Sequence, residues 1–211
     1  MRIFRDLLRK LKYKLKFLGK KEDLSFYYLK NSKTNQELKR LMDFYGSDKG
    51  GINNQHNFAQ YYSEIFYNDK EKINNILEIG LGSNNLEVPS NMGRNGKPLA
   101  SLRAWRDYFK NANIFGADID KSILKNENRI KTFYVDQTNK DSIRELFKEI
   151  GKIKFDIILE DGLHEFNANI CFFENSIDYL SQNGTYIIED IYYKDQKKFI
   201  NYYKKTKYNF S

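Results

Sequence analysis

Acidic side chains and one histidine follow two apolar runs of the chain, where two predicted strands would end. Glu160-Asp161-Gly-Leu-His164 follows Phe155–Leu159, and Glu189-Asp190 follows Tyr186–Ile188. Unpaired carboxylates on adjacent strand ends would repel one another, and a divalent cation with oxygen ligands such as Mg²⁺ relieves that repulsion. The alternative is that some of these acids pair with arginines or lysines. Taken together, the residues favour a metal site at Asp161, Glu189 and Asp190 beside His164.

Other strand ends carry residues suited to a nucleotide-like ligand. Glu78-Ile-Gly-Leu-Gly82 would let the backbone approach a ligand closely, Asp118 could accept from both hydroxyls of a ribose, and Asp136-Gln137 could face an adenine edge. The alternative for each acid is a helix N-cap or a solvated turn. A nicotinamide-binding fingerprint is disfavoured, because Asn85 stands at its third glycine and Asp118 comes 36 residues after Gly82 instead of about 20.

These residues need a sheet that brings the strand ends together. Apolar periodicity and turn residues predict helices that alternate with short buried strands, which implies an α/β fold with a mostly parallel sheet and helices on both faces. The first predicted helix begins at a Thr34/Glu37 capping box and ends at Gly46, and another is capped by Ser142 and Glu145. The remaining predicted helices are Phe58–Phe66, Leu99–Phe109, 121–129 and 167–181. The predicted strands are Ile76–Ile79, Ile114–Asp118, Thr132–Val135, Phe155–Leu159 and Tyr186–Ile188, with a polar loop over 83–98.

The net charge of +8 lies in the first 21 residues, which hold nine Lys/Arg and one acid, Asp6. The rest of the 211-residue chain has 27 basic and 27 acidic groups. A neutral body argues against a nucleic-acid groove. Residues 1–33 are predicted to be a basic amphipathic extension. Its residues 1–21 either bind an anionic membrane surface or pack on the protein body or a partner chain. The single cysteine, Cys171, fits a reducing cytoplasm.

Several motifs give the chain a family resemblance over about residues 45–193. The Asp-x-x-His motif, followed 25 residues later by Glu-Asp, is the most specific of them. The motifs are Gly46-Ser-Asp-Lys-Gly50, His56, Tyr61-Tyr62, Leu77-Glu-Ile-Gly-Leu-Gly82, Ser101–Phe109, Gly116-Ala-Asp-Ile-Asp120, Asp136-Gln137, Glu160-Asp161-Gly-Leu-His164 and Ile188-Glu189-Asp190. With these motifs the chain resembles the class I S-adenosylmethionine-dependent methyltransferases, in particular the metal-dependent sugar O-methyltransferases of the mycinamicin type and their capsular-polysaccharide relatives.

The resemblance implies a Rossmann-like methyltransferase domain over 34–211, with lid helices at 34–68 and a cofactor-binding core at 74–211. It implies S-adenosylmethionine and Mg²⁺ or Mn²⁺ as cofactors, metal ligands at Asp161, Glu189 and Asp190, and catalysis by His164 as base together with Asp161. The implied lid lies near His56 and Tyr62. The implied cofactor contacts are Tyr62, Glu78, Gly80, Gly82, Ser101, Asp118, Asp136, Gln137 and Glu160.

The expected reaction is O-methylation of a sugar hydroxyl, on a nucleotide-activated sugar or heptose used for capsular or surface polysaccharide. The alternatives are another small acceptor, such as a phosphoramidate or a macrolide-like glycoside, and a non-catalytic nucleotide-binding module. The expected protein is a homo-oligomer without a nucleic-acid partner, cytoplasmic or peripheral at the inner membrane surface. The family fold ends with a helix and two further strands, yet about 20 residues follow Asp190. Either Lys207–Ser211 begins a sixth strand of a sequence cut short, or the sheet is incomplete.

Overall fold

The computed structural model describes residues 36–51 and 56–205. The predicted basic extension over residues 1–33, the Thr34 cap and the predicted strand start at Lys207–Ser211 lie outside these ranges. Within the described ranges, no helix is both long enough and apolar enough to cross a membrane.

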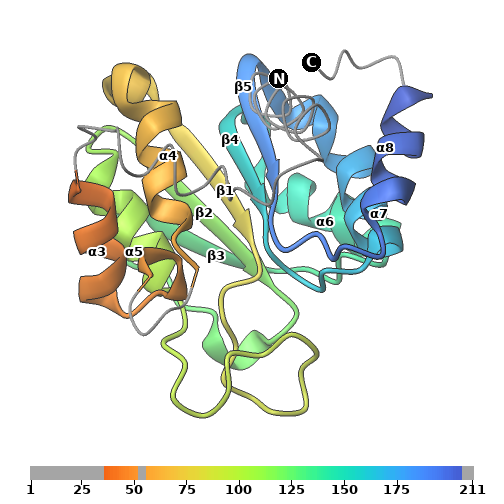
Figure 1. The fold of residues 1–211 in the computed structure, drawn as a ribbon, viewed down its shortest axis with the longest axis horizontal. Helices are drawn as coiled ribbons and strands as arrows, with labels where there is room; N and C mark the ends of the chain where they lie inside the picture. Colours follow the sequence, from red (N-terminus) through yellow and green to blue (C-terminus); the bar gives the residue numbers. More distant parts are fainter. Residues whose placement is uncertain (1–35, 52–55, 206–211) are drawn as a thin grey trace, which may run out of the picture.

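A five-stranded parallel sheet forms the centre of the domain (Figure 1). Its order is β3-β2-β1-β4-β5, and each pair of neighbouring strands is parallel. The strands are β1 (Asn75–Ile79), β2 (Asn113–Asp118), β3 (Ile130–Tyr134), β4 (Phe155–Glu160) and β5 (Leu180–Ile188). The three central strands, β2, β1 and β4, are buried along almost their whole length, as expected for a sheet that is covered on both faces. The predicted α/β fold class is therefore confirmed.

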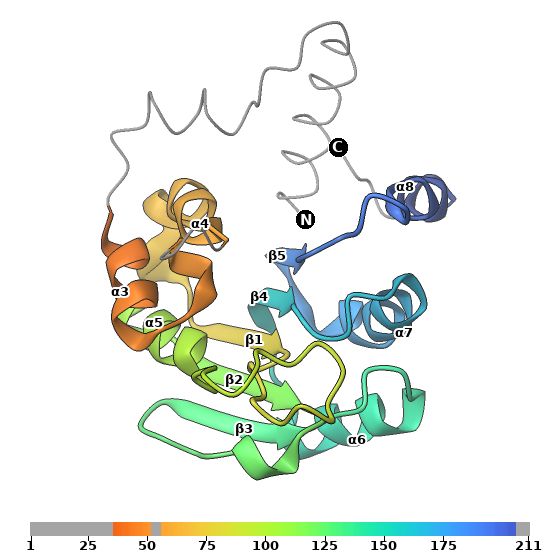
Figure 2. The ribbon, with the colours of Figure 1, turned by 60° about the horizontal axis from the view of Figure 1, so that its bottom comes forward.

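Helices cover both faces of this sheet (Figures 1 and 2). Along β1, successive side chains alternate between two cores, so that Ile76 packs into one and Leu77 into the other. The first core joins the sheet to α3 (Glu37–Tyr45), α4 (Phe58–Phe66) and α5 (Ala100–Tyr108). The second joins it to α6 (Lys140–Ile150), α7 (Phe166–Ser176) and α8 (Gln196–Lys204).

The predicted helix over 121–129 is wrong. Only a 3₁₀ turn forms there, η4 (Lys121–Ile123), which begins where the Asp120 side chain accepts from the Ser122 amide. The next residues make an isolated antiparallel bridge between Glu127 and Ile130. Glu127 is held by Arg103, with Nη2 and Oε1 2.7 Å apart. A short polar connection with one ion-paired acid lacks the apolar stripe that packs a helix on a sheet.

One predicted helix start and one helix end also differ from the structure. The N-cap of α6 is Asn139, whose side chain accepts from two backbone amides, whereas Ser142 lies inside the helix and its Oγ accepts from the Asp136 amide. The described N-cap of α3 is Gln36, which makes no side-chain capping bond. Gly46 ends α3 as predicted, in the left-handed conformation. Helix α7 ends at Ser176, followed by the 3₁₀ turn η5 (Ile177–Tyr179) in place of a continuous helix to residue 181.

The strand order determines where a ligand can bind. The chain moves outward from β1 in both directions, through β2 and β3 on one side and through β4 and β5 on the other. Loops that leave neighbouring strands β1 and β4 therefore diverge, and a crevice forms beyond the carboxyl ends of these strands. The loop 83–98 crosses this same edge of the sheet (Figure 2).

Candidate active site

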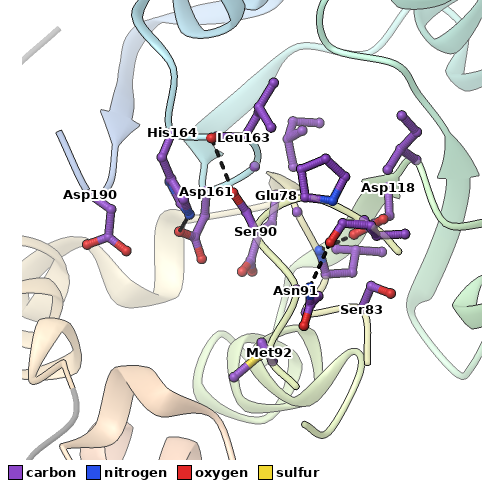
Figure 3. Close-up of a pocket in the computed structure, with 18 of the residues that line it drawn as sticks. Glu78, Ser83, Ser90, Asn91, Met92, Asp118, Asp161, Leu163, His164 and Asp190 are labelled. Atoms are coloured by element: carbon purple, nitrogen blue, oxygen red, sulfur yellow. Dashed lines mark hydrogen bonds and ion pairs between the residues drawn. The ribbon is translucent and has the colours of Figure 1, made fainter. Parts of the chain in front are cut away.

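A cavity of about 680 Å³ lies beyond the carboxyl ends of the strands (Figure 3). This volume is in the range of small-molecule and cofactor sites. Loop 83–98, the ends of β1 and β2, and the residues after β3, β4 and β5 contribute to its lining. Of the predicted site residues, those that line it are Glu78, Gly80, Gly82, Ser101, Asp118, Asp136, Gln137, Asp161, His164 and Asp190. Three others, Tyr62, Glu160 and Glu189, are buried outside the lining.

Three of these residues form a compact group of possible metal ligands. Asp161 and His164 come from the loop after β4, and Asp190 follows β5 (Figure 3). One ligand atom from each lies within 4.8 Å of the others. His164 Nε2 is 3.9 Å from Asp161 Oδ1, while His164 Nδ1 is buried without a hydrogen-bond partner in the described part of the chain. Two carboxylates and an imidazole with a free nitrogen suit a divalent cation and a bound hydroxyl group.

His164 and Asp190 share an uncommon backbone conformation. Their φ angles are +59° and +50°, in the left-handed region that non-glycine residues seldom adopt. Such conformations cost roughly 1–3 kcal/mol and cluster at functional sites. The surrounding structure therefore fixes the directions in which these two side chains point.

Glu189 takes a different position from the one expected of a third metal ligand. Its Oε2 accepts a hydrogen bond of 2.6 Å from Lys49 Nζ, and its Oε1 accepts from the Tyr62 hydroxyl. Burial raises the pKa of Glu189, and the nearby Asp161 carboxylate adds to the rise. The geometric group thus contains His164 in place of Glu189, and metal ligation by Glu189 stays a prediction. Tyr62 holds the Glu189 carboxylate from outside the cavity lining.

Lys49 is a central residue of the site that the sequence reasoning did not single out. Its ammonium contacts Asp161 Oδ2, Glu189 Oε2 and, at 3.8 Å, Glu78 Oε1. Burial alone would lower the pKa of Lys49, but the three carboxylates raise it well above its ordinary value. The expected alternative, that the acids pair with basic residues, therefore applies to Asp161 and Glu189. Buried acids need a cation within reach, but nothing in Gly46-Ser-Asp-Lys-Gly50 marks Lys49 as that cation among the many lysines of the chain.

The glycine loop after β1 lies directly against the loop that carries Asp161. Gly80 has φ +86°, and a Cβ there would lie 2.0 Å from the Asp161 carbonyl oxygen. The Asp118 carboxylate accepts from the Leu81 amide at 2.6 Å and from the Asp120 amide at 2.8 Å. Asp118 lines the cavity, so it can both shape this loop and face a ligand.

Glu78 is a buried carboxyl that faces the cavity. It accepts from Ser101 Oγ at 2.8 Å and from Trp105 Nε1 at 2.6 Å. Burial raises its pKa to about 7, and Asp161 adds to the rise, while Lys49 and the two hydrogen bonds oppose it. Ser101 and Trp105 thus fix the orientation of a carboxyl group that titrates close to neutral pH.

Glu160 and Gln137 support the loop after β4, which holds Asp161 and His164. Gln137 Nε2 donates to Glu160 Oε1 at 2.8 Å, and Gln137 Oε1 accepts from the Leu163 amide at 2.8 Å. Asn169 also donates to Glu160. Burial raises the pKa of Glu160 to about 7. The Gln137 amide therefore connects β4 to the loop that holds Asp161 and His164, while the neighbouring Asp136 accepts from the Thr138 amide and hydroxyl.

Two contacts bring other segments over the cavity. Ser90 Oγ, in loop 83–98, donates to the Leu163 carbonyl at 3.2 Å (Figure 3). His56 lines the cavity, and its Nδ1 is 3.5 Å from Asp190 Oδ1. These contacts fit the predicted lid near His56, whose movement stays a prediction.

Comparison with known proteins gives the family context for this geometry. No family model matches the chain. It is 31% identical, over 147 residues, to an 8-demethyl-8-α-L-rhamnosyl tetracenomycin-C 2′-O-methyltransferase of Streptomyces olivaceus, covering 70% of this chain and 35% of that protein. It is 31% identical to the mycinamicin VI 2″-O-methyltransferase of Micromonospora griseorubida, covering 74% of this chain and 36% of that protein.

The solved structures agree with these sequence matches. The MycE methyltransferase of mycinamycin biosynthesis, in complex with Mg and SAH, superposes with a TM-score of 0.62 and 28% identity, covering 77% of this chain and 42% of that one. A further MycE structure contains Mg, SAH and mycinamycin VI. The chain thus spans little more than a third of the curated relatives' length.

The sheet order, the cavity beyond its carboxyl edge and the superposition on MycE together identify a class I S-adenosylmethionine-dependent methyltransferase fold. Within that class, the chain is a relative of the metal-dependent sugar O-methyltransferases of the mycinamicin type, which confirms the predicted resemblance. Its likeness to capsular-polysaccharide enzymes stays a prediction.

Proposed function

We propose that the chain transfers a methyl group from S-adenosylmethionine to a sugar hydroxyl with the help of a divalent cation, Mg²⁺ or Mn²⁺. The observation that carries this proposal is the group of Asp161, His164 and Asp190 within 4.8 Å at one end of the cavity. The similarity to MycE, which was solved with Mg and SAH, supports the same assignment.

Residues at the ends of β1 and β2, and after β3, would hold the cofactor. Gly80 and Gly82 have no side chains to block its approach, Asp118 can accept from the ribose hydroxyls, and Asp136 can face the adenine. Glu78, Ser101 and Gln137 complete this part of the lining. When bound, S-adenosylmethionine supplies an electrophilic methyl group. Tyr62 and Glu160, which lie outside the lining, would act by holding neighbouring side chains in place.

Asp161 and Asp190 would hold the cation, with Glu189 as the predicted third ligand. The donor set fits the group, because carboxylate oxygens are the ligands that Mg²⁺ prefers. When bound, Mg²⁺ supplies positive charge that lowers the pKa of a sugar hydroxyl in contact with it. Asp190 lines the same cavity as the proposed cofactor residues, so the acceptor and the methyl donor can meet there.

His164 would remove the proton of the acceptor hydroxyl. Its Nδ1 is buried and makes no hydrogen bond within the described residues, so a nitrogen is left to accept a proton. Asp161 Oδ1, 3.9 Å from Nε2, would stabilise the imidazolium that forms. General-base catalysis of this kind is worth roughly 10²–10⁴ in rate.

The proposed acceptor is a sugar with neighbouring hydroxyls. The relatives named above methylate a rhamnosyl tetracenomycin and mycinamicin VI. For this chain we retain a nucleotide-activated sugar or heptose of capsular or surface polysaccharide as the expected acceptor, in a cytoplasmic homo-oligomer. Contact of residues 1–21 with a membrane surface or a partner belongs to the same proposal.

The function is tested with purified protein, S-adenosylmethionine, Mg²⁺ and two acceptor panels, nucleotide sugars and rhamnosyl glycosides. Mass spectrometry should detect a product heavier by one methylene with at least one acceptor, and the panel that reacts identifies the carrier. His164→Ala should retain S-adenosylhomocysteine and Mn²⁺ affinity in calorimetry but lose about 10²–10⁴ in rate. Excess Mg²⁺ should not rescue this variant, whereas it would partly rescue a lost metal ligand. An unaffected His164→Ala enzyme would rule out the assigned base.

A further inference from the structure

Lys49 reaches the site from outside the sheet. It lies on the 3₁₀ turn η1 (Asp48–Gly50), between α3 and α4, and its side chain is 3% exposed. The turn is packed closely on α3, because a Cβ at Gly50 would lie 2.0 Å from Asp43 Oδ1. Contacts of η1 with both α3 and α4 fix the start of the Lys49 side chain. The ammonium is therefore held in place by a different segment from the acids it contacts.

The Lys49 ammonium and the candidate metal group share one carboxylate. Asp161 Oδ2 contacts Lys49, while Asp161 Oδ1 faces His164 Nε2 at 3.9 Å. Glu189 Oε2 lies 2.6 Å from the same ammonium. Two of the three predicted metal ligands therefore have their negative charge balanced by a lysine.

We propose that Lys49 is a built-in counter-ion of the metal site, which stabilises Asp161 and Glu189 before a divalent cation binds and thereby weakens the affinity for that cation. This inference rests on the proposed metal site. A fixed positive charge opposes a second cation on the same carboxylates, since like charges a few ångströms apart repel one another strongly when they are partly shielded from water. Without the ammonium, the buried acids would repel one another and the metal-free protein would be less stable.

The consequence is an opposite effect on metal affinity and on metal-free stability. A neutral residue at position 49 should tighten divalent binding and lower the melting temperature in EDTA. Replacement of a residue that only shapes the site would lower both the affinity for the divalent cation and the melting temperature. The position therefore distinguishes a counter-ion from a purely structural lysine.

The test is a titration of Mn²⁺ into metal-free protein, followed by the paramagnetic resonance signal of free Mn²⁺. Lys49→Met and Lys49→Gln should each bind Mn²⁺ at least about tenfold more tightly than the unmodified chain, and Lys49→Arg should bind it with similar affinity. Lys49→Gln keeps a hydrogen-bond donor without the charge. Lys97→Met is the matched control, because Lys97 lines the same cavity but is exposed.

Melting curves with EDTA and with Mn²⁺ complete the test. Both neutral variants should melt at a lower temperature than the unmodified chain in EDTA. Added Mn²⁺ should raise their melting temperature by more than it raises that of the unmodified chain. Unchanged or weaker Mn²⁺ binding by both variants would overturn the counter-ion role while the metal site stands. Failure of both to fold even with Mn²⁺ would overturn it as well, because the bound cation should replace the lost charge. Absence of Mn²⁺ binding by the unmodified chain would refute the metal site itself.

Discussion

Replacement of Glu160 by glutamine should make the protein more stable at alkaline pH. Glu160 is fully buried at the end of β4, and burial raises its pKa from 4.5 to about 7. A carboxyl whose pKa is higher in the folded state favours folding only while it is protonated. Its contribution to the free energy of unfolding is complete below pH 4.5 and is lost as the pH rises through about 7.

The magnitude follows from the size of the shift. A rise of this size in pKa means that the protonated and the ionised forms of Glu160 differ by about 3 kcal/mol in their contribution to the free energy of unfolding. Glutamine has nearly the same shape and no charge to desolvate. Asn169 Oδ1 is buried without a partner in the described part of the chain and, after rotation of the Asn169 amide, could accept from the side-chain amide introduced at position 160. The Gln137 contact should survive, because the new carbonyl oxygen can accept from Gln137 Nε2.

The assay is urea unfolding of the unmodified chain and of Glu160→Gln at pH 4.5, 6, 7 and 8. The difference in free energy of unfolding should be small at pH 4.5 and should grow to about 2–3 kcal/mol in favour of the variant at pH 8. Taking the difference cancels the contributions of groups that both proteins share, including Glu78. A difference that stays constant across this range would refute the assignment of a raised Glu160 pKa.

Two further predictions concern the loops around the cavity. Gly80→Ala should destabilise the fold by roughly 2–5 kcal/mol, from its positive φ and the close Asp161 carbonyl, as measured by urea unfolding. Gly93→Ala is the control for the φ contribution, because Gly93 also has a positive φ (+70°) but a Cβ there meets nothing within 4 Å, so this variant should lose less stability. Ser90→Ala removes the hydrogen bond to the Leu163 carbonyl, so hydrogen exchange over 83–98 should become faster while exchange in α6 stays unchanged. Equal exchange in loop 83–98 of both proteins would contradict the role of Ser90 in holding this loop.

Five strands could be predicted because each contains a short apolar run that ends at a glycine or an acid, although the polar first half of β5, from Leu180, carries no such signal. Such runs identify buried parallel strands without knowledge of distant contacts. The cavity could be predicted for the same reason, since residues directly after parallel strands must meet at one edge. The helix boundaries were harder to predict from the sequence. Asn139 and Ser142 are both residues that can cap the start of α6, and only the structure shows which side chain reaches the free amides.

The charge balance of the site could not be predicted from spacing. Lys49 lies 112 residues before Asp161 and 140 before Glu189, so their contact depends on how the turn after α3 packs over the sheet. The sequence offered many lysines, and none was distinguished by its neighbours alone. Likewise, the contacts of Gln137 and Glu160 with the loop after β4 depend on how three separate segments of the chain meet.

Dependence of methyl transfer on a divalent cation tests the central claim most directly. Protein treated with EDTA and then freed of the chelator should transfer no methyl group from S-adenosylmethionine to a reactive sugar acceptor. Added Mg²⁺ or Mn²⁺ should restore the product, and Ca²⁺ should restore less, because it tolerates longer and looser coordination. Full methyl transfer in the presence of EDTA would contradict a role for the Asp161, His164 and Asp190 group as a metal-assisted catalytic site.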